Sequence, residues 1–80
     1  MVTVLRQDGL RVVIYLDDHD PPHVHVYLGA AEAKIGLELI AGRPPLLRAS
    51  AMRLGELRKA LRIVADNLPA LRARWEEIHG

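Results

Sequence analysis

The sequence lacks cysteine and phenylalanine and has only one tryptophan among its 80 residues. The absence of cysteine excludes disulfide bonds, a thiolate nucleophile and a cysteine-ligated zinc site, and it favours a cytoplasmic protein. Half of the residues are apolar, so the core must be built from valine, isoleucine, leucine and alanine. Such a core is thin, and we expect its stability to be modest or shared with a partner, a second copy included.

Long apolar runs and a strong net charge are also missing. No stretch approaches the ~18 to 20 apolar residues that span a bilayer, and the N-terminus has no signal-peptide pattern, so we expect no membrane association. The net charge is +1, with three basic and six acidic residues in 1–42 and eight basic and four acidic residues in 43–80. The positive charge of residues 43–80 is therefore small for a surface that binds nucleic acid, and an ordinary solvated helix surface is the alternative.

The first half of the chain has the pattern of β-strands. Asp8-Gly9 lies between two apolar runs, which predicts a two-residue hairpin turn because such turns need positive φ angles. Further along, apolar and polar residues alternate. Strands are expected at about 2–6, 10–16, 23–28 and 33–40. Pro44-Pro45 breaks the pattern because proline cannot donate a ladder hydrogen bond.

The second half changes to a helical period. From Ser50, a candidate N-cap, apolar residues recur at spacings of three and four, and Pro69 suits the first turn of a second helix. Helices are expected at about 50–67 and 69–78, with Trp75 as a core anchor. The prediction is a single α+β domain over residues 1–80, a four-stranded antiparallel meander followed by two helices packed on one face (ββββαα).

The most distinctive stretch is "DDHDPPHVHV", residues 17–26, which contains three of the four histidines. On a strand, Val24 and Val26 face the core, while His23, His25 and Tyr27 share the opposite face.

Three interpretations of this stretch stay open. In the first, His23 and His25 bind a metal of the zinc type together with His19 or an aspartate from the turn, since three ligands with an open position suit catalytic zinc. In the second, no metal or other cofactor is bound, and His23 and His25 act as acid and base on a phosphodiester, with Lys34 and Arg11 holding the phosphate. In the third, the stretch is a stiff turn or a partner surface.

The chain also resembles a known family. The stretch "TVLRQDGLRVVIYLDDHDPPHVHVYLGAAEAKIGLEL", followed by "GEL" and the terminal "LRARWEEIHG", resembles the bacterial domain of unknown function 4160 almost end to end. The most specific part runs from Asp18 to Val26, supported by Ala33-Lys34-Ile35 and Trp75. The chain departs from the family at Val12, Val13, Ile14 and Gly36, where members tend to be aromatic, and at Arg53, where members have serine.

The resemblance implies a small toxin–antitoxin-type component that acts through a cognate protein partner encoded nearby. It implies no catalytic role for any residue. It implies motif positions only, and these are His19, Pro21, Pro22, His23, His25 and Lys34. Asp18 and Tyr27 are further candidate motif or contact residues. The histidine-bearing strand face is then the candidate active or contact site, and the ribonuclease-like and zinc-type interpretations are the alternatives.

Overall fold

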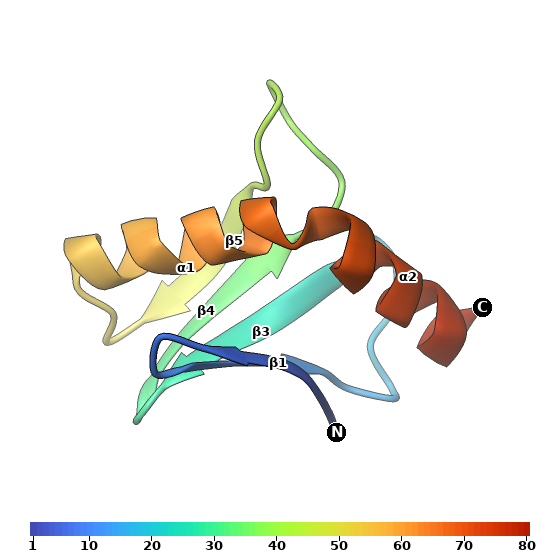
Figure 1. Cartoon of the computed structure of the whole chain (residues 1–80), viewed down its shortest axis with the longest axis horizontal. Coiled ribbons are helices and arrows are strands. Elements are labelled where there is room, and N and C mark those ends of the chain that lie inside the picture. Colours follow the sequence, from blue (N-terminus) through green and yellow to red (C-terminus); the bar gives the residue numbers. More distant parts are fainter.

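The computed structural model describes all 80 residues as a five-stranded antiparallel sheet followed by two helices (Figure 1). The strands lie in the sheet in chain order, so the predicted α+β class and the meander are confirmed. The elements are β1 (Val2–Gln7), β2 (Leu10–Ile14), β3 (His23–Leu28), β4 (Ala31–Gly36), β5 (Leu46–Ser50), α1 (Leu54–Asp66) and α2 (Leu68–His79).

The first hairpin forms at the predicted turn. Asp8 and Gly9 have φ angles of 52° and 81°, the left-handed region that a two-residue turn of this type requires. Strand β1 then pairs with β2 in an antiparallel register, interrupted by a bulge between Thr3 and Leu5.

The prediction of four strands was wrong, because β5 forms a fifth strand at the edge of the sheet. Residues 33–40 were expected to be one strand, but β4 ends at Gly36, and the Leu37 N–H donates to the Pro22 carbonyl just before β3. The chain then returns through Ala41 and Gly42, both at positive φ, and pairs with β4 along Leu46–Ser50. The prolines precede this edge strand, where their missing N–H groups are not needed.

The start of the first helix also differs from the prediction. Ser50 is the last residue of β5, and the N-cap of α1 is Arg53, whose backbone N–H donates to Glu56 Oε1 at 2.8 Å. This contact is one half of a capping box and satisfies one backbone donor near the helix N-terminus. The second helix has Pro69 in its first turn, as expected. Neither helix is long and apolar enough to cross a membrane.

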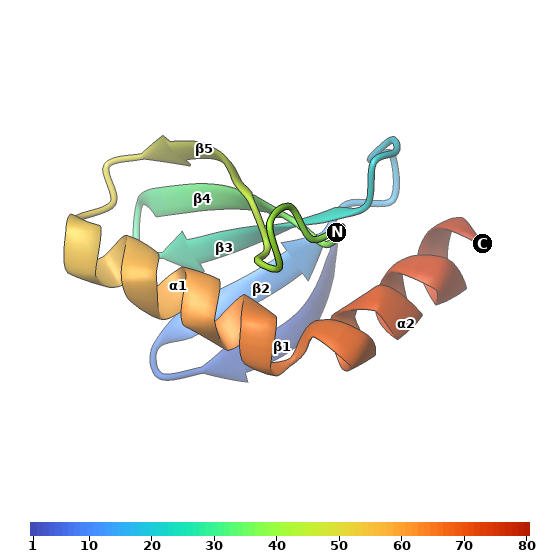
Figure 2. The same cartoon turned by 90° about the horizontal axis from the view of Figure 1, so that it is seen from above.

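Both helices lie on the same side of the sheet, and they bury its apolar face (Figure 2). The sheet contributes alternate residues such as Val12, Val24 and Ile35, each completely buried, and the helices contribute Ile63 and Trp75. Helix α1 crosses the strands, whereas α2 extends to the end of the sheet at which β3 begins (Figure 2). The C-terminal part of α2 therefore lies near the turn between β2 and β3.

A glycine substitution tests the close contact between β4 and the segment before β5. A Cβ added to Gly36 would lie 2.8 Å from Cγ of the rigid Pro45 ring, whereas a Cβ on Gly55 of α1 would meet no atom within 4 Å. We expect Gly36→Ala to lower the free energy of unfolding by about 1–3 kcal/mol through overpacking. Gly55→Ala, the control, should be neutral or stabilising by up to about 1 kcal/mol. Urea unfolding measures both, and equal effects of the two variants would contradict the close contact.

Candidate metal centre

The turn between β2 and β3 holds the carboxylate of Asp18 in a fixed position. Asp18 Oδ2 accepts the Tyr15 N–H at 3.0 Å, and the Asp18 N–H donates to the Tyr15 carbonyl at 3.1 Å. Strand β2 stops at Ile14, two residues before the predicted end, because the chain closes this turn. The Asp20–Pro21 peptide bond, which follows the turn, is cis. The two backbone contacts leave Asp18 Oδ1 free to face the start of β3.

Strand β3 carries His23 and His25, two residues apart as the alternation predicts. Both imidazoles are buried, at 4% and 7% exposure, and they are the only polar residues among the buried set. Their rings contact each other edge to face, with centroids 5.2 Å apart. Trp75 of α2 reaches the His23 ring, at a centroid distance of 5.3 Å. The packing therefore holds both rings.

The two imidazoles point their Nε2 atoms at the same oxygen. Asp18 Oδ1 lies 3.3 Å from His23 Nε2 and 3.5 Å from His25 Nε2. One ligand atom from each of these three residues lies within 4.8 Å of the other two. A carboxylate and two imidazole nitrogens thus converge on a small volume at the end of the sheet.

The second nitrogen of each ring also has an oxygen neighbour. His23 Nδ1 lies 2.9 Å from the Pro21 carbonyl oxygen, and because a carbonyl can only accept, Nδ1 carries the proton. His25 Nδ1 lies 3.5 Å from Glu32 Oε2 on the neighbouring strand β4. Neither ring nitrogen of His25 makes a hydrogen bond of good geometry, although the residue is buried. A buried imidazole without hydrogen bonds is costly, which marks His25 as a group that needs a ligand or a proton.

The fixed proton on His23 Nδ1 has a consequence for Nε2. In neutral His23, Nε2 presents a lone pair to the Asp18 carboxylate oxygen, which is repulsive at 3.3 Å. The repulsion disappears if Nε2 is protonated or if a metal cation lies between the two atoms. The arrangement therefore suits a positive charge at this position.

The local environment keeps Asp18 ionised. Burial on its own would favour the neutral acid, but the hydrogen bond from the Tyr15 N–H and the charges of His23 and His25 outweigh it and lower the pKa of Asp18 below its ordinary value of 3.8. Asp18 is an anion at neutral pH, as a metal ligand must be.

A pair of tyrosines packs beside His25. The Tyr15 and Tyr27 hydroxyls are hydrogen-bonded to each other, and the Tyr15 ring meets His25 edge to face at 4.8 Å. Burial, followed by the contacts with Tyr15 and Glu32, raises the pKa of Tyr27 well above its ordinary value of 10.0. Tyr27 thus keeps its proton at neutral pH. The guanidinium of Arg11 lies over the Tyr27 ring, 5.3 Å from its centroid.

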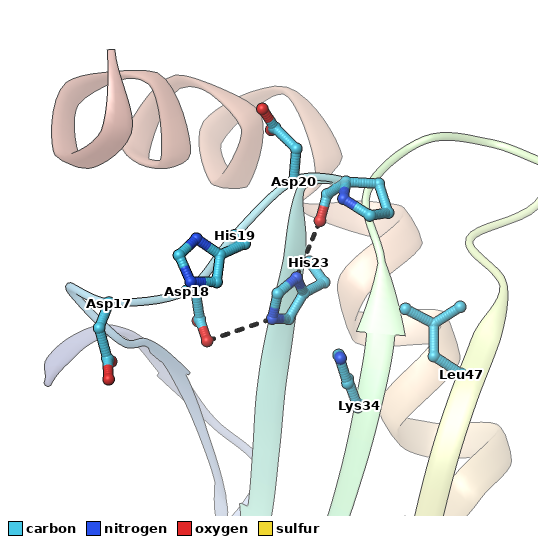
Figure 3. Close-up of a pocket in the computed structure, with 8 residues that line it drawn as sticks. Asp17, Asp18, His19, Asp20, His23, Lys34 and Leu47 are labelled. Carbon is cyan, nitrogen blue, oxygen red and sulfur yellow. Dashed lines mark hydrogen bonds and ion pairs between the residues drawn. The ribbon is translucent and has the colours of Figure 1, made fainter.

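An open pocket of about 300 Å³ lies directly beside the cluster (Figure 3). Lys34 enters it from β4, and the imidazole of His19 lies near Asp18 and His23 (Figure 3). Most of the residues that line the pocket are charged or polar, and Leu47 is the one large apolar residue among them. The lining residues are Asp17, Asp18, His19, Asp20, Pro21, His23, Lys34 and Leu47.

The candidate residues from the sequence divide into three groups. His23 and His25 meet as expected, but the third member of the group is Asp18 rather than His19, which is exposed and lines the adjacent pocket. Lys34 lines the same pocket as His19 and His23. Arg11 and Tyr27 pair with each other at the other end of β3.

Three neighbours of the site went unrecognised in the sequence. Glu32 was detectable, because alternation along "AEAKIG" puts Glu32 on the same strand face as Lys34. The contacts of Trp75 and His79 had no local signal, since α2 reaches the site only through tertiary packing. The His79 ring stacks on Trp75 at a centroid distance of 4.1 Å, and its buried Nε2 has no hydrogen-bond partner.

Comparison with known protein families supplies one match. The model of a family described as Domain of unknown function (DUF4160) matches residues 9–76, which include every residue of the site except His79. The chain belongs to this family. Corresponding searches of curated proteins and of solved structures find no match. For this DUF4160 protein, the family match indicates no activity, and the site itself carries the chemical information.

The pKa of Asp18 makes stability depend on pH in a defined direction. Because its folded-state pKa lies below 3.8, the carboxylate contributes fully to the free energy of unfolding above that pH, and the contribution is lost as the pH falls through the folded pKa. We therefore expect the free energy of unfolding of the metal-free wild type to be larger than that of Asp18→Asn at pH ~6. The difference between the two should shrink below about pH 3.8. Urea unfolding at several pH values measures it, and a difference independent of pH would contradict the lowered pKa.

Proposed function

We propose that this protein binds a divalent transition metal of the zinc class through Asp18, His23 and His25. The convergence of two histidine nitrogens on one carboxylate oxygen carries the proposal. Three protein ligands leave the fourth position of a tetrahedral metal for water or substrate, as in catalytic zinc sites. The polar pocket lined by Asp18 and His23 gives access to that position.

The distances fit a tetrahedral ion. Zinc lies ~2.0 to 2.2 Å from nitrogen and carboxylate oxygen, so two ligand atoms of a tetrahedron are about 3.3 to 3.5 Å apart. Asp18 Oδ1 lies 3.3 Å and 3.5 Å from the two Nε2 atoms. The ligand nitrogens of the two rings lie within 4.8 Å of each other, so all three atoms can face one ion.

The neighbours of the two histidines support the same proposal. A histidine that binds metal through one nitrogen usually donates the other N–H to a carbonyl or a carboxylate. His23 Nδ1 has the Pro21 carbonyl at 2.9 Å, and His25 Nδ1 has Glu32 Oε2 at 3.5 Å. Both Nε2 atoms are therefore the ones available to a metal.

The ligand types favour some metals over others. Two imidazole nitrogens suit zinc, cobalt, nickel or copper, whereas magnesium and calcium prefer oxygen ligands. Catalysis without metal by His23 and His25 has less support, because His25 is 7% exposed and does not line the pocket. A metal would instead give buried His25 a function that needs no contact with substrate.

Partner binding, the role implied by the toxin–antitoxin resemblance, stays a prediction. One surface feature bears on it. A pocket of about 170 Å³ next to the metal site is lined by Leu39, Ile40, Pro45 and Leu47. Leu39, Ile40 and Leu47 are 44%, 66% and 45% exposed. Co-expression with a candidate partner and size exclusion test it: co-elution with the wild type but not with Ile40→Ser supports this surface, and separate elution of the wild-type pair contradicts it.

Metal binding predicts a change in stability and in fluorescence. One equivalent of zinc or cobalt should bind, and at 100 times the dissociation constant it should raise the free energy of unfolding by about 2.7 kcal/mol. The only tryptophan, Trp75, lies against His23, so its fluorescence should change with the same stoichiometry. Asp18→Asn should weaken the affinity at least ~10-fold. Asp17→Asn, in the same turn but exposed and without an ion pair, should leave it unchanged.

One result would contradict the metal site. Folded wild-type protein that contains no metal by elemental analysis after zinc loading, and shows no thermal shift, would exclude the site.

Glu32 gives a second prediction, because it touches the metal site only through His25. We expect Glu32→Gln to weaken metal affinity by about 10- to 100-fold, the usual effect of losing a charged partner of a metal-bound histidine. Calorimetric titration with zinc measures the affinity, and circular dichroism checks the fold. Glu38→Gln removes the same charge two residues after β4 ends and is the control. Equal zinc affinity in the two variants would mean that Glu32 does not orient His25.

A further inference from the structure

Lys34 is the one lysine or arginine that lines the pocket, and its ammonium has no partner there. It stands directly opposite His25 in the β3–β4 register, and residues opposite each other share a face of the sheet. Its side chain enters the pocket on the side of His23 (Figure 3). The residue is half-buried, and its ammonium makes no hydrogen bond or ion pair with any part of the chain. A partly desolvated ammonium without a partner favours an anionic ligand.

The charge balance at the floor of the pocket depends on the metal. Asp18 supplies one negative charge and Lys34 one positive charge, so a divalent ion leaves an excess of two positive charges. Asp17 and Asp20 also line the pocket, but both are exposed, and their carboxylates point away from His23 and Lys34 (Figure 3). Water screens such exposed charges. The metal-loaded pocket thus attracts anions at its floor.

The pocket has the size and the charged lining residues for a small oxyanion. Its volume of about 300 Å³ is at the lower end for ligand sites, and Leu47 is its one large apolar residue. A tetrahedral phosphate group can place one oxygen at the open position of the metal and another near the ammonium. Lysine is a common point-charge partner for phosphate.

We propose that Lys34 and the metal held by Asp18, His23 and His25 form one binding site for a phosphate group, as carried by a phosphate ester. The inference rests on the proposed metal site and names the class of ligand that the site takes. In this site the Lys34 ammonium contacts the phosphate group and does not bind the metal.

The test uses the full chain loaded with one equivalent of zinc and titrated with inorganic phosphate in a calorimeter. Phosphate should bind the zinc-loaded protein and not the metal-free protein. Lys34→Met should weaken phosphate binding by about 10- to 100-fold, the usual effect of losing one charge-assisted contact, while zinc affinity stays within about twofold. The control is Lys59→Met, which changes the chain's only other lysine, a residue that donates to the Asp8 carbonyl far from the pocket.

The outcomes separate this inference from the proposed function. Failure of zinc to bind the wild type overturns both. Zinc binding without phosphate binding, or equal phosphate affinity in Lys34→Met and Lys59→Met, overturns the phosphate site and leaves the metal site intact. Equal affinity for phosphate in the presence and absence of zinc also overturns it. Acetate that competes as strongly as phosphate overturns the preference for a phosphate group.

Discussion

Asp18 Oδ1 lies 3.3 Å and 3.5 Å from two imidazole nitrogens at the start of β3, and the surrounding structure holds this arrangement. The turn closed by Tyr15 fixes the carboxylate. The pairing of β3 with β4 fixes His25 and brings Glu32 to its other nitrogen. The packing of α2 on the sheet brings Trp75 to His23. An anion and two buried imidazoles at this distance favour a shared positive charge, which is the physical reason for the proposed metal site.

Local chemistry in the sequence predicted the parts of the fold that depend on neighbours along the chain. The turn forms at Asp8-Gly9 because aspartate and glycine tolerate the positive φ angles that it requires. The alternation of valines predicted which strand faces are buried. Strand β5 was missed because all five of its residues are exposed, so neither alternation nor a buried run marks it. The start of α1 was misplaced because the cap uses the Glu56 side chain and the backbone of Arg53, whereas Ser50 had the better cap chemistry.

The candidate site was predicted in part, for a related reason. A strand's period places His23 and His25 on one face, so their proximity follows from sequence. The third ligand lies in a turn, where no period applies, and the choice between Asp18 and His19 depends on how Tyr15 closes that turn. Trp75 is 50 residues from His25 in the chain, and its contact with His23 arises only when α2 packs on the sheet. Tertiary contacts of this kind leave no local pattern.

The central claim is that Asp18, His23 and His25 bind one metal ion and leave a position open. X-ray absorption at the zinc edge, recorded on protein loaded with one equivalent of zinc, tests it most directly. We predict two imidazole nitrogens at ~2.0 to 2.1 Å and oxygen ligands at ~2.0 to 2.2 Å from one carboxylate and one water. A spectrum without imidazole scattering, or one that is unchanged by His25→Ala, would contradict the account.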